Sequence, residues 1–228
     1  MDRSLLDHML NPAAYPDPTT AVQHLQTHIS HLFLTDHYVY KVKKAVNFGF
    51  LDFTTLEKRR FYCHEELRLN RRLSPEIYLE VVALYHDAEG LLSFRAEGAP
   101  VEYAVKMRRM PEERMLSRLL EQGSATEADI AAIAAKVADF HAVAAQGNGI
   151  ALFGTVEAIR SNWLENLRQT VPYCGRTLSE RDHALIGEWA LQRLEQGGEL
   201  FLKRLQDGFI RECHGDLHAE NICLDGQV

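Results

Sequence analysis

The sequence predicts an α+β protein, because short β-type runs dominate its first half and helical periodicity dominates its second half. Apolar runs separated by turn residues recur up to Pro111, and one long amphipathic segment lies among them. The chain has 228 residues, of which 46% are hydrophobic, so it is long enough to bury a core. We expect an N-terminal lobe at 1–106, a connector at 107–111 and a mainly helical lobe at 112–228.

The first half is predicted to form a mostly antiparallel sheet. Residues 1–26 contain a short helix, a connector broken by prolines and a second helix, for which Asp17 is the expected N-cap and Pro18 the first helical residue. A hairpin follows, with strands at 29–34 and 38–42 joined by a three-residue turn. The remaining elements are an amphipathic helix at 54–73, which ends before Ser74-Pro75, and strands at 78–85, 91–95 and 101–107.

The second half is predicted to be helical until its last residues. Thr126 is the expected N-cap of a strong helix that runs to residue 145. Further helices are expected at 112–121, 155–170 and 179–206. Residues 222–224 form a short apolar run before Asp225-Gly226, which is typical of a strand that enters a hairpin turn.

Composition and charge exclude several classes of protein. The chain carries 25 basic and 32 acidic residues, a net charge of −7, so a nucleic acid is not an expected partner. Its four cysteines include no C-x-x-C pair, which argues against a disulfide framework or a zinc ribbon and favours a reducing compartment. The sequence has no apolar run long enough for a signal peptide or a membrane span. We therefore expect a cytoplasmic protein without a membrane partner.

The most informative motif is His214-x-Asp216-x-x-x-x-Asn221, which has the spacing of a kinase catalytic loop. In such loops the Asp orients and deprotonates the acceptor hydroxyl, and the Asn binds a magnesium ion. Phosphoryl transfer depends on positioning and on charge neutralisation, so a carboxylate must face the acceptor while an amide oxygen faces the metal. A phosphotransferase is the function that this spacing favours.

Two other interpretations of this region remain open. Asp216 and Asn221 are residue types that commonly cap or turn the backbone without any catalytic role. A metal cluster would use Cys213, His214, His218 and Cys223, although their spacing matches no common closed zinc site. No G-x-x-x-x-G-K-[ST] motif is present, which excludes a P-loop as the source of a nucleotide site in this chain.

The form of the loop, His214-Gly-Asp-Leu-His218, resembles that of the aminoglycoside phosphotransferase-like family of small-molecule kinases. The stretch from Thr27 to Leu73 is similar to a bacterial subgroup whose members often carry a C-terminal P-loop kinase-like domain. The resemblance implies a protein-kinase-like two-lobed fold with a nucleotide-binding N-terminal lobe. It also implies an ATP-dependent phosphotransferase that uses ATP and Mg²⁺ and acts on a small-molecule hydroxyl.

The same resemblance implies roles for residues at both ends of the chain. Asp216 and His214 are the expected catalytic residues, and Asn221 is the expected metal ligand. Lys41, in a strand-like Val-Tyr-Lys-Val run, is the expected phosphate-binding lysine, with Lys43 on the same face as the alternative. Glu66 is the expected partner of that lysine.

Further nucleotide contacts are expected around the sheet. No G-x-G-x-x-G motif precedes the hairpin, so the hydroxyls of Thr27 and Ser30 are the candidate phosphate donors. Met107 and Met110 would form an apolar pocket for the adenine beside the connector. An ordinary core role for both methionines remains equally open.

One requirement of the family is missing from the sequence. The family also uses an acidic residue on the strand after the loop to bind magnesium, but this chain ends at Asp225-Gly226-Gln227-Val228. We therefore expect a C-terminally truncated chain that is inactive by itself. The alternative is a non-catalytic nucleotide-binding or regulatory module of a larger two-domain protein.

Overall fold

The computed structural model describes residues 3–49 and 51–226, which pack into two compact units. The first unit comprises Met1–Ala134 together with Asp216–Val228, and the second comprises Ala135–Gly215. The predicted connector at 107–111 lies inside the first unit. The sheet and the Asp216–Asn221 part of the loop therefore belong to one unit, although nearly the whole sequence separates them.

The first unit contains a six-stranded sheet in the order β1-β2-β3-β6-β4-β5, in which all neighbouring strands are antiparallel. This sheet and the helices around it confirm the predicted α+β, kinase-like fold class. The strands are β1 (Gln23–Gln26), β2 (Ser30–Leu34), β3 (Tyr38–Lys43), β4 (Tyr78–His86), β5 (Leu92–Ser93) and β6 (Glu102–Arg108).

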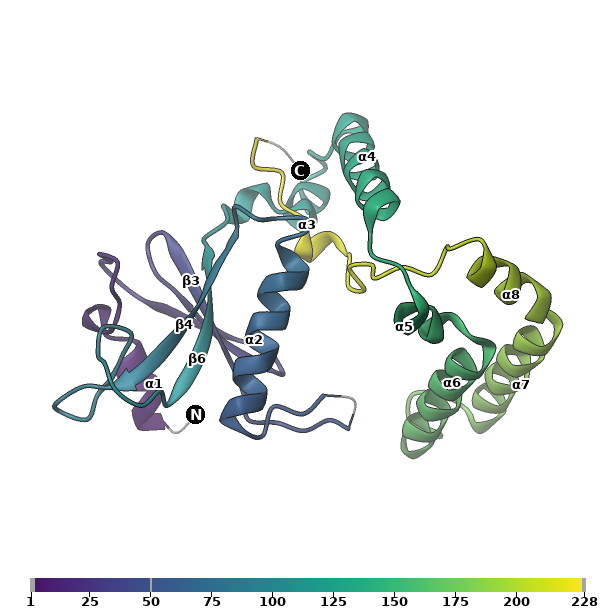
Figure 1. The fold of residues 1–228 in the computed structure, drawn as a ribbon, viewed down its shortest axis with the longest axis horizontal. Coiled ribbons are helices and arrows are strands. Elements are labelled where there is room, and N and C mark those ends of the chain that lie inside the picture. Colours follow the sequence, from purple (N-terminus) through teal and green to yellow (C-terminus); the bar gives the residue numbers. More distant parts are fainter. Residues whose placement is uncertain (1–2, 50, 227–228) are drawn as a thin grey trace. The chain divides into compact units, whose positions relative to one another are not determined.

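Different elements cover the two faces of the sheet. Successive side chains of a strand point to opposite faces, so neighbouring residues of β3 contact different elements. Tyr40 and Val42 face a hydrophobic core that also contains residues from helix α1 (Arg3–Met9) and the 3₁₀ turn η1 (Pro12–Ala14). Lys41 and Lys43 face helix α2 (Leu56–Asn70), which packs along β6 and β4 (Figure 1). The core of the first face consists of Met9, Ala14, Tyr15, Phe33, Tyr40, Val42, Leu84, Leu92 and Ala104.

Helix α2 is fixed at its first turn by polar contacts. The Thr55 side chain accepts a hydrogen bond from the backbone N–H of Lys58, as expected of an N-cap. Arg59 is buried and donates to the Glu102 carboxylate at 2.8 Å and to the carbonyl oxygen of Phe53 at 3.0 Å. The start of α2 is thereby held against β6.

The predicted second helix near the N-terminus is wrong. Asp17 is not an N-cap: its carboxylate accepts from the Tyr40 hydroxyl at 2.7 Å and lies 2.6 Å from the Lys106 ammonium. Residues 23–26 form the edge strand β1, whose backbone pairs with β2. Lys106 is buried and requires a counter-charge, so a contact distant in sequence determines the conformation around Asp17.

Helices α3 (Leu116–Glu121) and α4 (Glu127–Val143) follow the 3₁₀ turn η2 (Glu112–Arg114). The predicted cap of α4 is confirmed, because Thr126 accepts from the N–H of Asp129 while Asp129 accepts from the N–H of Thr126. A second, smaller core consists of Leu116, Leu119 and Leu224, with Ile222 packed against it.

The predicted strand at 222–224 is only partly correct. Cys223 forms a single antiparallel bridge with Met115. The N–H of Leu116 donates to the Ile222 carbonyl, and the N–H of Leu224 donates to the Arg114 carbonyl. Because its partner is a turn between two short helices, the pairing extends no further. It still ties the end of the chain to the start of α3.

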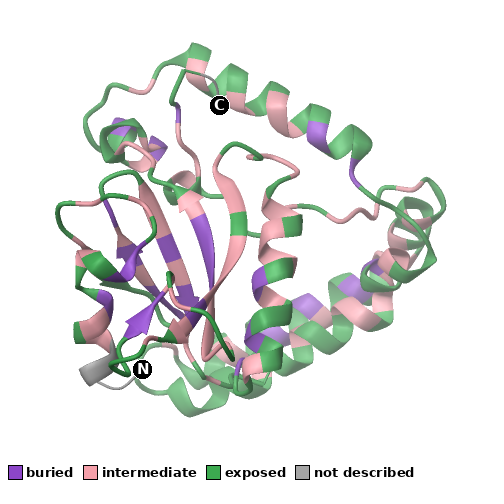
Figure 2. Ribbon diagram, turned by 60° about the vertical axis from the view of Figure 1, so that its left-hand side comes forward, coloured by how far each residue is buried: buried purple, intermediate pink, exposed green. Residues whose placement is uncertain are grey.

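The second unit contains helices and the loops between them, and α6 packs on α7. Besides the C-terminal part of α4, its elements are α5 (Asn148–Ala151), η3 (Leu152–Gly154), α6 (Val156–Thr170), η4 (Val171–Tyr173), α7 (Glu180–Gln196) and α8 (Gly198–Gln206). The single helix expected at 179–206 is interrupted at Gly197, where α7 ends and α8 begins. Figure 2 shows buried positions concentrated in the sheet and alternating with exposed ones along the helices. No helix among residues 3–49 and 51–226 is long and apolar enough to cross a membrane.

Replacement of Tyr40 by Phe is predicted to lower the free energy of unfolding by about 1–2 kcal/mol. The ring packing against Tyr15 and Phe94 is retained, but Asp17 loses the hydroxyl donor. Urea unfolding followed by circular dichroism measures the change. Tyr85→Phe, on β4, is the control, and an equal loss in the two variants would contradict the importance of the Asp17 contact.

Candidate functional site

The first part of the site is a buried cluster of one carboxylate and two ammonium groups. The Glu66 carboxylate lies 2.7 Å from Lys41 Nζ through Oε1 and 2.5 Å from Lys43 Nζ through Oε2. The side chains of Lys41, Lys43 and Glu66 are 25%, 5% and 13% exposed. The alternation of β3 places both lysines on the face that α2 covers, so the structure brings the predicted lysine, its alternative and the predicted glutamate together.

The cluster stays ionised because its members compensate one another. Burial by itself raises the pKa of Glu66, but the nearby ammonium groups of Lys41 and Lys43 hold that pKa below its ordinary value. Burial likewise lowers the pKa of Lys41, and the Glu66 carboxylate more than offsets this effect, so that the pKa is raised. The neighbouring Glu65 pairs with Arg68 on the more exposed side of α2.

A thiol and a phenol next to the cluster stay neutral at neutral pH. Burial raises the pKa of the Cys63 thiol to about 12, and this thiol lies 3.9 Å from the carbonyl oxygen of Tyr103. Burial also raises the pKa of the Tyr78 hydroxyl. The ring of Phe53 lies beneath the Lys43 ammonium, 4.8 Å from ring centre to Nζ. At neutral pH the formal charge of this part of the site therefore comes from the two lysines and Glu66.

The predicted phosphate donors lie at the connection between β1 and β2. Thr27 Oγ1 accepts hydrogen bonds from the N–H groups of Ile29 and Ser30, at 3.3 and 3.0 Å. Ser30 stands opposite Lys43 in the β2–β3 register and is fully buried. Its Oγ has no hydrogen-bond partner among the residues that the structure describes. Thr27 thus shapes this connection, and the Ser30 hydroxyl does not reach the surface.

The two methionines predicted to contact the adenine are both half-buried. Met107 lies on β6, opposite Val39 of β3 and Tyr78 of β4. Met110 follows in the connector, where the N–H of Arg109 donates to the carbonyl oxygen of His37. The register places Met107 on the same face of the sheet as Lys41, at the end of β6 that leads into the connector.

The loop residues Asp216 and Asn221 are neighbours in space. The Asn221 side-chain amide donates to the Asp216 backbone carbonyl at 2.9 Å and to its carboxylate at 3.2 Å. The side chain of Asp216 is 77% exposed, and His218 lies 3.5 Å from its other oxygen. Gly215 precedes it with φ of +82°, a conformation that favours glycine over the Arg of protein kinases. His214 is half-buried and belongs to the second unit.

The donor groups of both parts suit a magnesium–nucleotide complex. Carboxylate and amide oxygens, as in Asp216 and Asn221, are the hard ligands that Mg²⁺ prefers. Ammonium groups, as in Lys41, suit phosphate oxygens. The alternative zinc cluster receives no support, because no group of three or more His, Cys, Asp or Glu side chains placed to hold a metal occurs in the described part of the chain.

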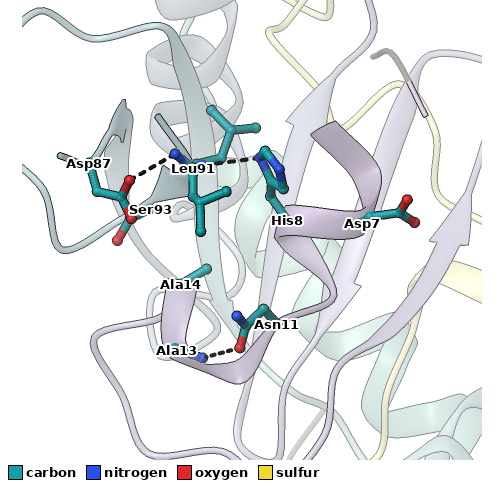
Figure 3. A pocket seen from close by; sticks show the side chains of 9 residues that line it. Asp7, His8, Asn11, Ala13, Ala14, Asp87, Leu91 and Ser93 are labelled. Carbon is teal, nitrogen blue, oxygen red and sulfur yellow. Dashed lines mark hydrogen bonds between the residues drawn. The ribbon is translucent and has the colours of Figure 1, made fainter. Parts of the chain in front are cut away.

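A separate pocket of about 190 Å³ lies beside α1, η1 and the β4–β5 turn (Figure 3). Three of its polar side chains already bond to the backbone: His8 accepts from Leu92, Asn11 accepts from Ala13, and Asp87 accepts from Leu91. None of the predicted site residues lines it. The pocket therefore belongs to the packing of the N-terminal segment.

Replacement of Glu66 by Gln is predicted to destabilise the protein by about 2 kcal/mol at pH 7, because two ammonium groups lose their counter-charge. Since the pKa of Glu66 is lower in the folded than in the unfolded chain, this stabilisation is present above the unfolded pKa of about 4.5. It is lost as pH falls through the folded value. The difference between the two proteins should therefore shrink below about pH 4.5.

Urea unfolding between pH 7 and pH 3 tests this expectation. Glu65→Gln is the matched control on the same helix, since the ion pair between Glu65 and Arg68 is partly exposed and should contribute less than about 0.5 kcal/mol. A constant difference between wild type and Glu66→Gln across this range would show that the charge of Glu66 is not responsible.

Comparisons with known proteins show which family the chain belongs to. The model of the phosphotransferase enzyme family (APH) matches residues 34–228. The chain is 31% identical over 204 residues to the uncharacterized protein Mb2027c of Mycobacterium bovis and to the uncharacterized protein Rv2004c of Mycobacterium tuberculosis. These alignments cover 89% of this chain and 39% of each relative, so the chain spans well under half of their length. No solved structure matches the chain significantly. The family match begins at the last residue of β2 and covers β3, α2 and the loop from His214 to Asn221, and the chain belongs to the phosphotransferase enzyme family.

Proposed function

We propose that the chain is the nucleotide-binding part of an ATP-dependent phosphotransferase that acts on a small-molecule hydroxyl with the help of Mg²⁺. The observation that carries this proposal is the partly buried ion pair of Lys41 and Glu66, in the same compact unit as Asp216 and Asn221. A lysine held by a helix glutamate and an Asp–Asn loop are the two parts that kinase-type phosphoryl transfer requires.

Each residue then has a distinct task. The Lys41 ammonium, which is more exposed than that of Lys43, binds the phosphates, and Glu66 holds it in place. The exposed Asp216 carboxylate orients the acceptor hydroxyl and accepts its proton, and His214 supports the start of this loop. Asn221 would hold the metal through its amide oxygen, and Mg²⁺, when bound, would neutralise charge on the phosphates. Met107 and Met110 contact the adenine.

We further propose that these 228 residues bind nucleotide without completing a turnover. With Asp216 assigned to the acceptor hydroxyl, the loop offers the metal only the neutral amide oxygen of Asn221, which is too little charge to hold Mg²⁺ firmly on a polyphosphate. The competing proposal is a non-catalytic nucleotide-binding module that serves an attached P-loop kinase-like domain. Proteins of the length of the mycobacterial relatives have room for such a domain beyond the matched region. An assay of ATP consumption by the native gene product separates the two proposals, because only the phosphotransferase would consume ATP through Asp216.

Lys41→Met is predicted to weaken ATP binding by about tenfold or more, because a charge-assisted contact to phosphate is lost. Titration of the 228-residue chain with a fluorescent ATP analogue in the presence of Mg²⁺ measures this affinity. Lys58→Met is the control, since Lys58 pairs with Asp52 near the start of α2. Equal affinities of wild type and Lys41→Met would refute the proposed phosphate site.

Asp216→Asn is predicted to lower magnesium-dependent ATP consumption by the native gene product at least 100-fold, because the general base is removed. ATP affinity should stay within about threefold, since the carboxylate is assigned to the acceptor hydroxyl rather than to the phosphates. Asp207→Asn, whose carboxylate pairs with Lys203 on the surface of α8, is the control. Unchanged consumption in Asp216→Asn would favour the non-catalytic module.

A further inference from the structure

Glu66 binds two lysines, although a phosphate clamp needs only one. Lys41 and Lys43 each approach a different oxygen of the carboxylate, at 2.7 and 2.5 Å. The two lysines are separated by Val42 on β3, and α2 supplies the single carboxylate. The cluster of Lys41, Lys43 and Glu66 therefore carries a formal charge of +1 at neutral pH, which favours an anion nearby.

The two lysines differ in their surroundings. The Lys43 side chain is 5% exposed and is enclosed by the Phe53 ring, by the opposing residue Ser30 on β2 and by α2. The Lys41 side chain is 25% exposed. Lys41 is thus accessible to a ligand, while Lys43 is almost completely buried.

This difference matters when a phosphate binds. If Lys41 were the only partner, its movement toward a phosphate would leave the Glu66 carboxylate buried and unpaired, which costs several kcal/mol. Lys43 stays within hydrogen-bond distance of the carboxylate through the other oxygen. The carboxylate then remains charged and paired while Lys41 divides its contacts between Glu66 and the ligand.

We infer that Lys43 is a positioning residue, which keeps Glu66 ionised and in place so that Lys41 can bind the nucleotide phosphates. The inference rests on the proposed nucleotide site. Lys43 contacts neither the phosphates nor the acceptor in this scheme. Lys43 affects ATP affinity only through Glu66. The affected contacts are those to the phosphates and not those to the adenine.

The test compares ATP with adenosine, which lacks phosphates, by calorimetric titration of the 228-residue chain. Lys43→Met should weaken ATP binding about tenfold and leave adenosine binding within about twofold. In the Glu66→Gln background the same substitution should change ATP affinity less than about twofold, because the carboxylate through which Lys43 acts is already neutral. Equal losses for ATP and adenosine, or an undiminished loss in the Glu66→Gln background, would overturn the inference.

A measurement on the wild-type protein covers the case in which Lys43→Met does not fold. With lysine ammonium groups observed by ¹⁵N NMR, ATP and Mg²⁺ should shift the Lys41 signal and leave the Lys43 signal almost unchanged. A Lys43 shift as large as that of Lys41 would contradict the positioning role. If wild type binds ATP but Lys43→Met binds it equally well, only the inference fails. If wild type binds no ATP, the proposed function and the inference fail together.

Discussion

The carboxylate of Glu66 is the constraint on which the first unit depends. A carboxylate that is 13% exposed is costly unless opposite charges lie within hydrogen-bond distance, and both of its partners come from β3. Helix α2 must therefore lie on the face of the sheet where Lys41 and Lys43 emerge. The contact of Arg59 with Glu102 fixes the other end of the same helix on β6, so ion pairs at both ends determine how α2 lies.

On the opposite face of the sheet, a buried lysine is also neutralised by a carboxylate. There Lys106 is paired with Asp17, and the Tyr40 hydroxyl donates to the same carboxylate. Tyr40 and Lys106 are direct partners in the β3–β6 register, and Lys41 is the next residue along β3. The N-terminal segment and α2 thus hold the central strands from both sides. A rigid pair of central strands is a suitable base for a phosphate clamp, because small displacements of the clamp weaken its contacts.

The loop that contains Asp216 and Asn221 differs from the cluster around Glu66, because its polar side chains are not buried. Asp216 and Asn221 are exposed and polar, and apolar side chains next to them in sequence provide the anchor. Leu224 and Ile222 pack against α3, and two backbone hydrogen bonds join this segment to Arg114 and Leu116. Asp216 and Asn221 therefore remain accessible to solvent, while the backbone that follows them is tied to the unit that contains the Lys41–Lys43–Glu66 cluster.

Elements that depend on local pattern could be predicted from the sequence. The loop spacing, the β2–β3 hairpin, the approximate extent of α2 and the Thr126 cap each follow from residues a few positions apart, and the resemblance to the family follows from the loop and the stretch from Thr27 to Leu73. The predicted apolar face of α2 is not found, because Arg59 and Cys63 are its buried residues and Phe61 is exposed. The tertiary structure decided what depends on distant partners. It made Asp17 a counter-ion instead of a helix cap, made 23–26 a strand and placed both lysines on Glu66. Local periodicity shows which face a side chain occupies, but only the packed chain shows which buried charge it must neutralise.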